Sequence, residues 1–312
     1  MALSQTHHRR HGSARWYRPN CTEFPADRQA RLNSLTIEVQ CNAMTTQRPL
    51  RGFLLDMDGT VYVSDHALPG AVETIAALRG RGFRVAFISN KPLEPGSAYA
   101  AKLTGFGIPT RPDEVITSGY VLSRHLMQIA PGARVFVVGE PPLLDEMRQA
   151  GLQLTEDPAQ IDYVVAAFDR TFDYRKWNIA FQAIKFHGAH FVATNPDRTC
   201  PVEGGEIPDC AGIIAALEVT TGKPVELVAG KPSPMMIQAG SALLGLPVEQ
   251  CLVVGDRLET DILMGREAGA RTAVVLTGVT RREHLATSPV QPDYVLQDIG
   301  GLLDLLDKAA GG

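Results

Sequence analysis

The 312-residue chain lacks long apolar runs and a strong excess of either charge. Its longest apolar stretches, such as 163–168 and 211–217, are much shorter than the roughly 18 residues that a membrane helix needs, which excludes an integral membrane protein. Thirty Lys and Arg residues against 34 Asp and Glu residues give a net charge of −4, so there is no overall electrostatic attraction to nucleic acid. With 45% hydrophobic residues the chain has the composition of a globular protein, and its length allows two domains.

The chain also lacks a regular cysteine pattern. Its cysteines are odd in number and have no metal-ligand spacing, which favours a reducing, cytoplasmic location: Cys21, Cys41, Cys200, Cys210 and Cys251. Cys200 and Cys210 are close enough in sequence to form a redox pair, but buried, inert thiols are the simpler interpretation.

Residues 1–43 differ in composition from the rest of the chain. They begin with a cluster of His and Arg residues and contain no continuous apolar core of a secretory signal. An organelle transit peptide or a metal-binding His tract would fit parts of this segment, but a disordered extension explains it more simply. Met44 is a possible alternative start.

From residue 50 onward, short apolar runs alternate with helical segments. The runs that predict strands are 52–55, 84–88, 134–138, 163–168, 190–193, 226–229, 251–254, 272–276 and 294–296. Such alternation predicts an α/β protein with helices on both faces of a parallel sheet.

Two helices can be predicted in more detail. Trp177, Ala180, Phe181 and Ile184 repeat at helical spacing, and Gly188 follows shortly after them. A second helix should begin at 233–234, where a capping Ser precedes a Pro.

Polar residues follow four of the predicted strands. They are Asp56, Asp58, Gly59 and Thr60; Ser89 and Asn90; Lys231; and Gly255, Asp256 and Asp261. Taken alone, each group is explained by a turn, a helix cap or a surface charge. In a doubly wound sheet, however, the carboxyl ends of the strands form one ligand-binding crevice, so we expect these side chains to meet.

This combination of side chains indicates a chemistry. Clustered carboxylates repel one another unless cations compensate them, which implies an oxygen-ligated divalent metal, with Mg²⁺ favoured. Lys231, Ser89 and Asn90 then suit an anion, and a phosphoryl group fits best. Asp56 is the candidate nucleophile and Asp58 the candidate general acid and base.

The ordered motifs 56–60, 89–90, 230–232 and 255–261 resemble those of the haloacid dehalogenase (HAD) superfamily, and more narrowly those of its NagD-like phosphatases. The resemblance runs from about 51 to 306 and includes the segments 168–169, 172–174, 193–197 and 204–212, which are similar to that subfamily's inserted cap. It implies a three-layer, Rossmann-like core with a large inserted α/β cap domain.

The resemblance also implies a role for each motif residue. Asp56 would be the nucleophile and a Mg²⁺ ligand, and Asp58 the acid and base that binds the metal through its backbone carbonyl. Ser89, Asn90 and Lys231 would hold the phosphoryl group, and Asp256 would bind the metal. Thr60 would support the nucleophile loop, and Asp261 would support the metal directly or through other ligands.

The stretch of about 140 residues between Asn90 and Lys231 is too long for a simple connection, so it must contain a second domain. We expect a catalytic core of 44–132 and 225–312, and a substrate-selecting cap of 133–224. Within the cap, 201–211 is the expected loop that closes over the leaving group. The candidate cap residues for substrate contact are Asn195, Asp197 and Asp209, although Asp209 is equally compatible with a solvent-facing loop acid.

These observations predict a cytoplasmic, Mg²⁺-dependent phosphomonoesterase that acts on small phosphorylated metabolites through an aspartyl-phosphate. The expected partner is a small-molecule phosphate ester, with no nucleic acid and no membrane, and the resemblance makes a homodimer through the cap possible. A phosphotransferase or phosphomutase would share the same residues and pass the group to another hydroxyl. A non-catalytic phosphometabolite-binding protein is a third alternative, but binding alone would not need Asp58.

Overall fold

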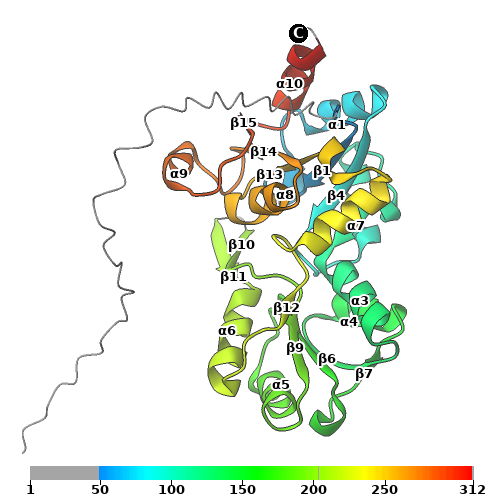
Figure 1. The fold of residues 1–312 in the computed structure, drawn as a ribbon, viewed down its shortest axis with the longest axis vertical. Coiled ribbons are helices and arrows are strands. Elements are labelled where there is room, and N and C mark those ends of the chain that lie inside the picture. Colours follow the sequence, from blue (N-terminus) through cyan, green and yellow to red (C-terminus); the bar gives the residue numbers. More distant parts are fainter. Residues whose placement is uncertain (1–48, 203, 311–312) are drawn as a thin grey trace, which may run out of the picture. The chain divides into compact units, whose positions relative to one another are not determined.

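The computed structural model describes residues 49–202 and 204–310, which form two parallel sheets with helices packed against them (Figure 1). The predicted extension 1–43, with Met44, Cys21 and Cys41, lies outside the described residues. None of the helices in the described part combines the length and the hydropathy needed to cross a membrane.

The first sheet has six parallel strands in the order β15-β14-β13-β1-β4-β5. They are β1 (Gly52–Asp56), β4 (Arg84–Ser89), β5 (Val115–Thr117), β13 (Cys251–Gly255), β14 (Arg271–Val275) and β15 (Tyr294–Leu296). The strand order reverses between β1 and β13, which makes that position the topological switch point where ligands bind in such sheets.

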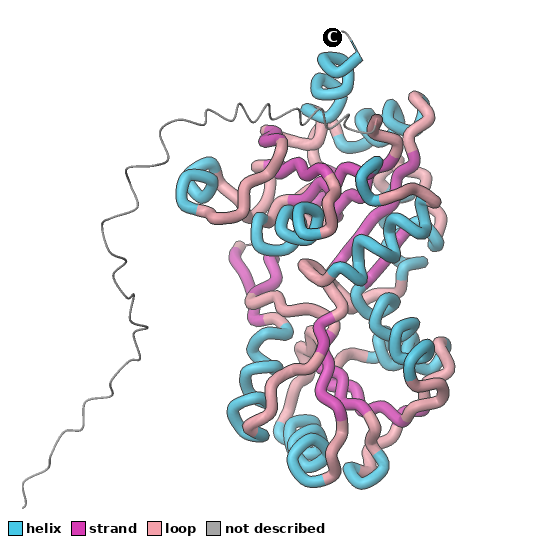
Figure 2. Tube along the Cα trace, in the orientation of Figure 1, coloured by secondary structure: helices cyan, strands magenta, loops and turns pink. Residues whose placement is uncertain are grey.

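Helices cover both faces of the first sheet (Figure 2). Phe53 and Leu55 of β1 face a cluster that includes α1 (Ala71–Gly80), α2 (Gly96–Gly105) and α10 (Gly301–Ala310). Leu54 faces the other way, toward α3 (Ser118–Ile129), α7 (Pro234–Leu244) and α8 (Leu263–Glu267). Both sides of β1 are therefore buried, which explains its continuous apolar sequence and confirms the predicted three-layer α/β fold.

The second sheet has five parallel strands in the order β12-β9-β8-β6-β7. They are β6 (Arg134–Val138), β7 (Gln153–Leu154), β8 (Tyr163–Ala166), β9 (His190–Ala193) and β12 (Leu227–Val228). Its helices are α4 (Pro141–Gln149), α5 (Tyr174–Phe186) and α6 (Cys210–Thr221). One apolar cluster runs from Leu54 of the first sheet through Leu126 and Met147 to Val165 of the second.

Two hairpins and several short turns complete the described structure. The hairpins pair β2 (Tyr62–Val63) with β3 (His66–Ala67), and β10 (Thr199–Val202) with β11 (Gly205–Pro208). Short 3-10 turns lie at Pro112–Glu114, Pro158–Gln160 and Val248–Gln250, a π-helical turn at Leu258–Ile262 leads into α8, and α9 spans Arg282–Thr287.

The two helices predicted in detail are present. Ala180 and Ile184 of α5 are buried as expected, the Asp173 carboxylate accepts a hydrogen bond from the Lys176 backbone N–H, and Gly188 has a φ of 76°. At α7, the Ser233 hydroxyl accepts a hydrogen bond from the Met235 N–H, and Pro234 is the first helical residue.

Two expectations for the second half of the chain are wrong. Segment 201–211, expected as a loop, forms most of the β10–β11 hairpin and the start of α6, since its Gly residues permit a tight turn between two short strands. The strand predicted at 226–229 was expected to deliver Lys231 from the first sheet, but β12 pairs with β9 in the second sheet. The second sheet therefore extends past the boundary predicted at 224.

The described cysteines carry no disulfide. Cys200, Cys210 and Cys251 are buried free thiols, so Cys200 and Cys210 match the interpretation as buried thiols rather than a redox pair.

Candidate active site

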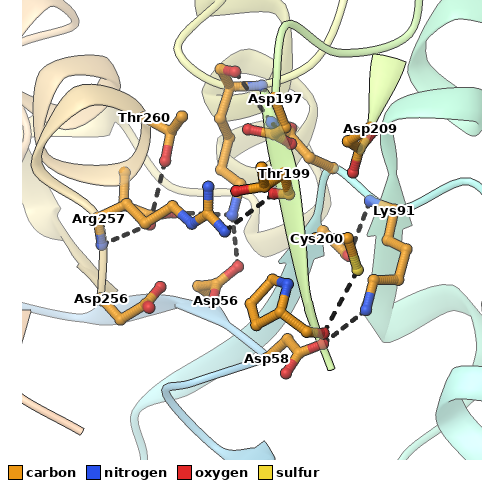
Figure 3. A pocket seen from close by; sticks show the side chains of 15 residues that line it. Asp56, Asp58, Lys91, Asp197, Thr199, Cys200, Asp209, Asp256, Arg257 and Thr260 are labelled. Carbon is orange, nitrogen blue, oxygen red and sulfur yellow. Dashed lines mark hydrogen bonds and ion pairs between the residues drawn. The ribbon is translucent and has the colours of Figure 1, made fainter. Parts of the chain in front are cut away.

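The predicted strand-end residues meet in a pocket at the switch point of the first sheet (Figure 3). Asp56 is the last residue of β1, and Asp256 directly follows β13, the strand beside it. The pocket is also lined by Asp58, Ser89, Asn90, Lys91, Asp197, Thr199, Cys200, Pro201, Asp209, Lys231, Arg257, Thr260 and Asp261. The structure thus brings together residues that lie up to 205 positions apart in the chain.

Three buried carboxylates form the centre of the pocket. Asp56, Asp256 and Asp261 each place one oxygen within 4.8 Å of the others. All three are less than 8% exposed. An all-oxygen set of this kind is the donor chemistry that a hard divalent cation requires.

Lys231 is the ammonium that faces this group. Its Nζ lies 2.7 Å from Asp261 Oδ1 and also donates to Asp56 Oδ1. Burial lowers the pKa of Lys231, but the Asp261 and Asp56 carboxylates raise it by more, so the lysine stays protonated. One positive charge therefore faces three potential negative charges.

Burial and this imbalance shift two of the carboxyl groups, those of Asp56 and Asp256, toward their neutral forms. Burial, followed by repulsion from Asp56 and Asp261, raises the pKa of Asp256 to about 8. Burial also raises the pKa of Asp56 to about 7, against the opposing effect of Lys231. A bound cation would relieve this cost, so the charge state as well as the donor set fits a divalent metal.

Two glycines leave room for the Asp256 carboxylate. A Cβ at Gly278 would stand 2.0 Å from Asp256 Oδ2, and a Cβ at Gly59 would stand 2.7 Å from the same atom. Gly59 also has a φ of 87°, which other residues rarely adopt. The Val279 N–H donates to Asp256 Oδ2 at 2.7 Å, which fixes the carboxylate in this space.

Thr60 and Asp261, the two predicted supporting residues, both contact neighbouring polar groups of the pocket. Thr60 Oγ1 donates to Asp56 Oδ2 at 3.3 Å. The Asp261 carboxylate is engaged through both oxygens, because Oδ1 accepts from Lys231 and Oδ2 accepts from the Arg257 N–H at 3.3 Å. Asp261 is therefore fixed in position beside the two other acids.

Ser89 and Asn90 follow β4 at the same edge. Ser89 Oγ accepts a hydrogen bond from the Lys91 N–H at 3.1 Å. The Asn90 side chain grips the backbone of Lys231: Oδ1 accepts from the Lys231 N–H at 2.7 Å, and Nδ2 donates to the Lys231 carbonyl at 3.0 Å. Asn90, at the end of β4, thus holds the backbone of Lys231 in place.

Lys91 is a pocket residue that sequence reasoning missed. Its Nζ lies 2.6 Å from Asp58 Oδ2, and both side chains are about one-quarter exposed. Burial lowers the pKa of Lys91, but Asp58 raises it by more. Its position directly after Ser89 and Asn90 was the available signal, although a single lysine there is also typical of a solvated surface.

The candidate cap residues lie against the pocket from the second sheet. Asn195 Nδ2 donates to Asp197 Oδ2 at 3.0 Å and to Asp209 Oδ1 at 3.1 Å. Asp209 is buried and precedes α6, and burial raises its pKa to about 6. The three side chains therefore form one hydrogen-bonded cluster.

The β10–β11 hairpin contributes a further wall of the pocket (Figure 3). Thr199, Cys200 and Pro201 of β10 line it, and Arg257 Nη2 donates to the Thr199 carbonyl at 3.4 Å. The hairpin thus reaches Arg257, which follows β13.

Comparison with protein families finds two matches along the chain. A family model described as haloacid dehalogenase-like hydrolase matches residues 53–153, and one described as HAD-hydrolase-like matches 228–302. Together they include every core residue of the pocket described above, from Asp56 to Asp261.

Individual relatives cover most of the chain. The sugar phosphatase AraL of Bacillus subtilis is 38% identical over 259 residues, which are 82% of this chain and 93% of AraL. The structure of a 4-nitrophenylphosphatase from Thermotoga maritima matches with a TM-score of 0.78 and 35% identity, over 82% of this chain and 97% of that one. A glycerol phosphate phosphatase from Mycobacterium tuberculosis, solved in complex with magnesium, matches with a TM-score of 0.74 and 33% identity, over 81% of this chain and 76% of that one.

Proposed function

Because the chain belongs to the haloacid dehalogenase family and is a phosphatase of its NagD-like group, we propose that it hydrolyses small phosphate monoesters with Mg²⁺ and an aspartyl-phosphate intermediate. One observation carries the proposal. Lys231 contacts Asp56 and Asp261 at the same time, in a pocket where three buried carboxylates lie together. A site of this kind has both a nucleophile and the means to neutralise a phosphoryl group.

The proposed metal ligands are the Asp56 and Asp256 carboxylates and, as a third ligand, the backbone carbonyl of Asp58. The bound Mg²⁺ would neutralise charge on the phosphoryl oxygens and orient them. An excess of buried carboxylate charge supports this assignment, as does the complex of the mycobacterial relative with magnesium. Asp261 is the third acid of the cluster, and its hydrogen bonds with Lys231, the Arg257 N–H and the Thr260 hydroxyl suit it to holding Lys231.

In the first step, an Asp56 carboxylate oxygen attacks phosphorus and the bond from phosphorus to the leaving oxygen breaks. Asp58, which lines the same pocket, gives its proton to that oxygen, so the product leaves as a neutral alcohol. Lys231 has three N–H bonds, of which two point to Asp56 and Asp261. Its third can hold a phosphoryl oxygen, together with the Ser89 hydroxyl.

In the second step, water attacks phosphorus and gives a proton to the Asp58 carboxylate. The bond from phosphorus to Asp56 breaks, which releases inorganic phosphate and restores both acids. Lys91 Nζ lies 2.6 Å from Asp58 Oδ2 and so holds in position the side chain that accepts this proton.

The proposed substrates are sugar, polyol or nucleotide monophosphates. The relatives are named as phosphatases of sugar phosphate, 4-nitrophenyl phosphate and glycerol phosphate, which supports small esters without selecting one. We propose the segment 133–228, extended to include β12, as the cap that makes this selection, with the β10–β11 hairpin nearest the leaving group. A cytoplasmic location and a homodimer through the cap stay predictions.

A phosphate-release assay tests the proposal. The purified chain should release inorganic phosphate from 4-nitrophenyl phosphate and from members of a metabolite panel, in equal amount to the alcohol formed. Chelation should stop the release, and added Mg²⁺ should restore it. Transfer of the phosphoryl group to an added alcohol in place of water would instead identify a phosphotransferase, and product formation in excess chelator would contradict the metal assignment.

A further inference from the structure

Asp197 connects the loop after β9 to the catalytic edge of the first sheet. A single oxygen, Oδ2, accepts hydrogen bonds at 3.0 Å from both Asn90 Nδ2 and Asn195 Nδ2. Asn90 follows β4 of the first sheet, and Asn195 follows β9 of the second. The two strand ends therefore meet through one carboxylate oxygen.

The Asn195 amide has no N–H left to donate to a substrate. Its side chain is fully buried, and its Nδ2 donates to Asp197 and Asp209. Its Oδ1 accepts from Thr194 Oγ1 at 2.8 Å. An amide group has two N–H bonds, so both are used in holding the two acids.

The Asn90 amide is used in the same way. One N–H points to Asp197 and the other to the Lys231 carbonyl, while Oδ1 accepts from the Lys231 N–H. The backbone beside it is tightly packed, because a Cβ at Gly230 would stand 2.6 Å from Asn90 Oδ1 and 2.5 Å from the Thr194 carbonyl. Rotation of the Asn90 amide would therefore break the contacts that hold the Lys231 segment.

We propose that Asp197 is a positioning residue that acts on Lys231 through Asn90, rather than a contact for the leaving group. The chain of hydrogen bonds runs from Asp197 to Asn90, then to the Lys231 backbone, and from the Lys231 ammonium to Asp56 and Asp261. The loop after β9 thereby sets the position of the ammonium that faces the nucleophile. This inference rests on the proposed phosphatase function.

The test compares Asp197→Ala with Asp197→Asn, with kcat and KM measured separately on 4-nitrophenyl phosphate and glycerol 3-phosphate. Alanine removes the acceptor, so kcat should fall by about 10–100-fold with little change in KM, as expected when supporting contacts of a catalytic group are lost. The fall should be the same for both esters, because Lys231 faces the phosphoryl group that they share. Asparagine keeps an oxygen that can accept both bonds, so it should retain nearly all of the wild-type kcat.

Asp145→Ala is the matched control, because this exposed acid of α4 pairs only with Arg148 at the surface among the described contacts. It should leave both kinetic constants unchanged. A loss confined to one ester, or a change mainly in KM, would overturn the proposal in favour of a leaving-group contact.

Asp197→Asn decides the matter even if the alanine variant is too unstable to purify. If kcat in Asp197→Asn falls as much as predicted for Asp197→Ala, the negative charge is what matters, and positioning through hydrogen bonds is contradicted. An inactive wild-type chain would instead refute the proposed function itself.

Discussion

At the carboxyl edge of the second sheet, Glu140 and Asp169 each meet their own cation, whereas at the edge of the first sheet three acids share one lysine. Glu140, just after β6, binds Arg170 through two hydrogen bonds of 2.7 Å, and Asp169, after β8, lies 2.6 Å from Lys176 Nζ. In the described pocket, Lys231 is the one cation that forms an ion pair with any of Asp56, Asp256 and Asp261. The same residue types at equivalent places in two parallel sheets are thus balanced in one and unbalanced in the other.

The difference between the two edges is visible in the pKa values of their acids. Hydrogen bonds from Arg170 hold the pKa of Glu140 below its ordinary range. Burial and the two neighbouring acids raise the pKa of Asp256 to about 8. Paired acids stabilise the fold, and unpaired buried acids cost stability until a cation reaches them. Charge balance therefore distinguishes the Glu140 and Asp169 ion pairs from the three-carboxylate cluster that we propose as the metal site.

The largest expected effect is at the proposed nucleophile, Asp56. Asp56→Asn keeps the size of the side chain but removes the attacking oxygen's charge, so kcat should fall by about 10⁴-fold or more. Phosphate release from highly purified protein measures it. Glu140→Gln, at the balanced edge, should keep turnover, and equal turnover in Asp56→Asn and wild type would remove the functional distinction between the two edges.

The next largest effect is at the proposed general acid, Asp58. Asp58→Ala should lower kcat by roughly 10²–10⁴-fold on an alkyl phosphate, which needs a proton on its leaving oxygen. The loss should be smaller on 4-nitrophenyl phosphate, whose leaving group is already stable as an anion. Rates on the two esters give this ratio directly, and an equal loss on both would argue against proton donation by Asp58.

A smaller expected effect is on thermal stability. Removing an acid should raise Tm at the carboxyl edge of the first sheet and lower it at that of the second. The folded-state pKa of Asp256 lies above its ordinary value of 3.8, so the metal-free folded protein keeps a proton that the unfolded chain releases. Its stability should therefore fall as pH rises from about 4 to about 8. In chelator at pH 8, Asp256→Asn removes the cost of burying an ionised carboxylate. It should raise Tm by roughly 2–4 °C for each kcal/mol of that cost.

Glu140→Gln should do the reverse. The Glu140 pKa is depressed, so its contribution is present above its ordinary pKa of 4.5 and is lost as pH falls. Loss of the charge-assisted pair should cost about 1 kcal/mol at neutral pH, because Arg170 is partly exposed. Thermal melts of both variants in chelator decide the matter, and a shift of the same sign in the two would show that the edges do not differ.

The sequence predicts most of the first sheet and its edge because the signals there are local. Strand β1 is a continuous apolar run, and Asp56 and Asp58 stand at its end, where a parallel sheet gathers its ligands. Ser233 and Pro234 mark the start of α7 through ordinary capping chemistry.

What the sequence does not predict depends on pairing between distant segments. β12 has two residues, and nothing in Leu227–Val228 tells which sheet it joins. Lys231 nevertheless reaches the carboxyl edge of the first sheet, because Asn90, 141 positions earlier in the sequence, hydrogen-bonds its backbone. Lys91 and the Asp197 contact were missed for the same reason, since each is defined only by a partner from another strand end.

Magnesium binding to wild type and Asp256→Asn tests the central claim most directly, since it asks whether the unbalanced edge takes up a cation without relying on turnover. Calorimetry at pH 7.5 should show one Mg²⁺ bound per wild-type chain. Tm should rise with added Mg²⁺, by the equivalent of about 2.7 kcal/mol at 100 times Kd. Asp256→Asn should lose most of both effects. Absence of Mg²⁺ binding in the wild type, or an unaltered affinity in Asp256→Asn, would contradict the account.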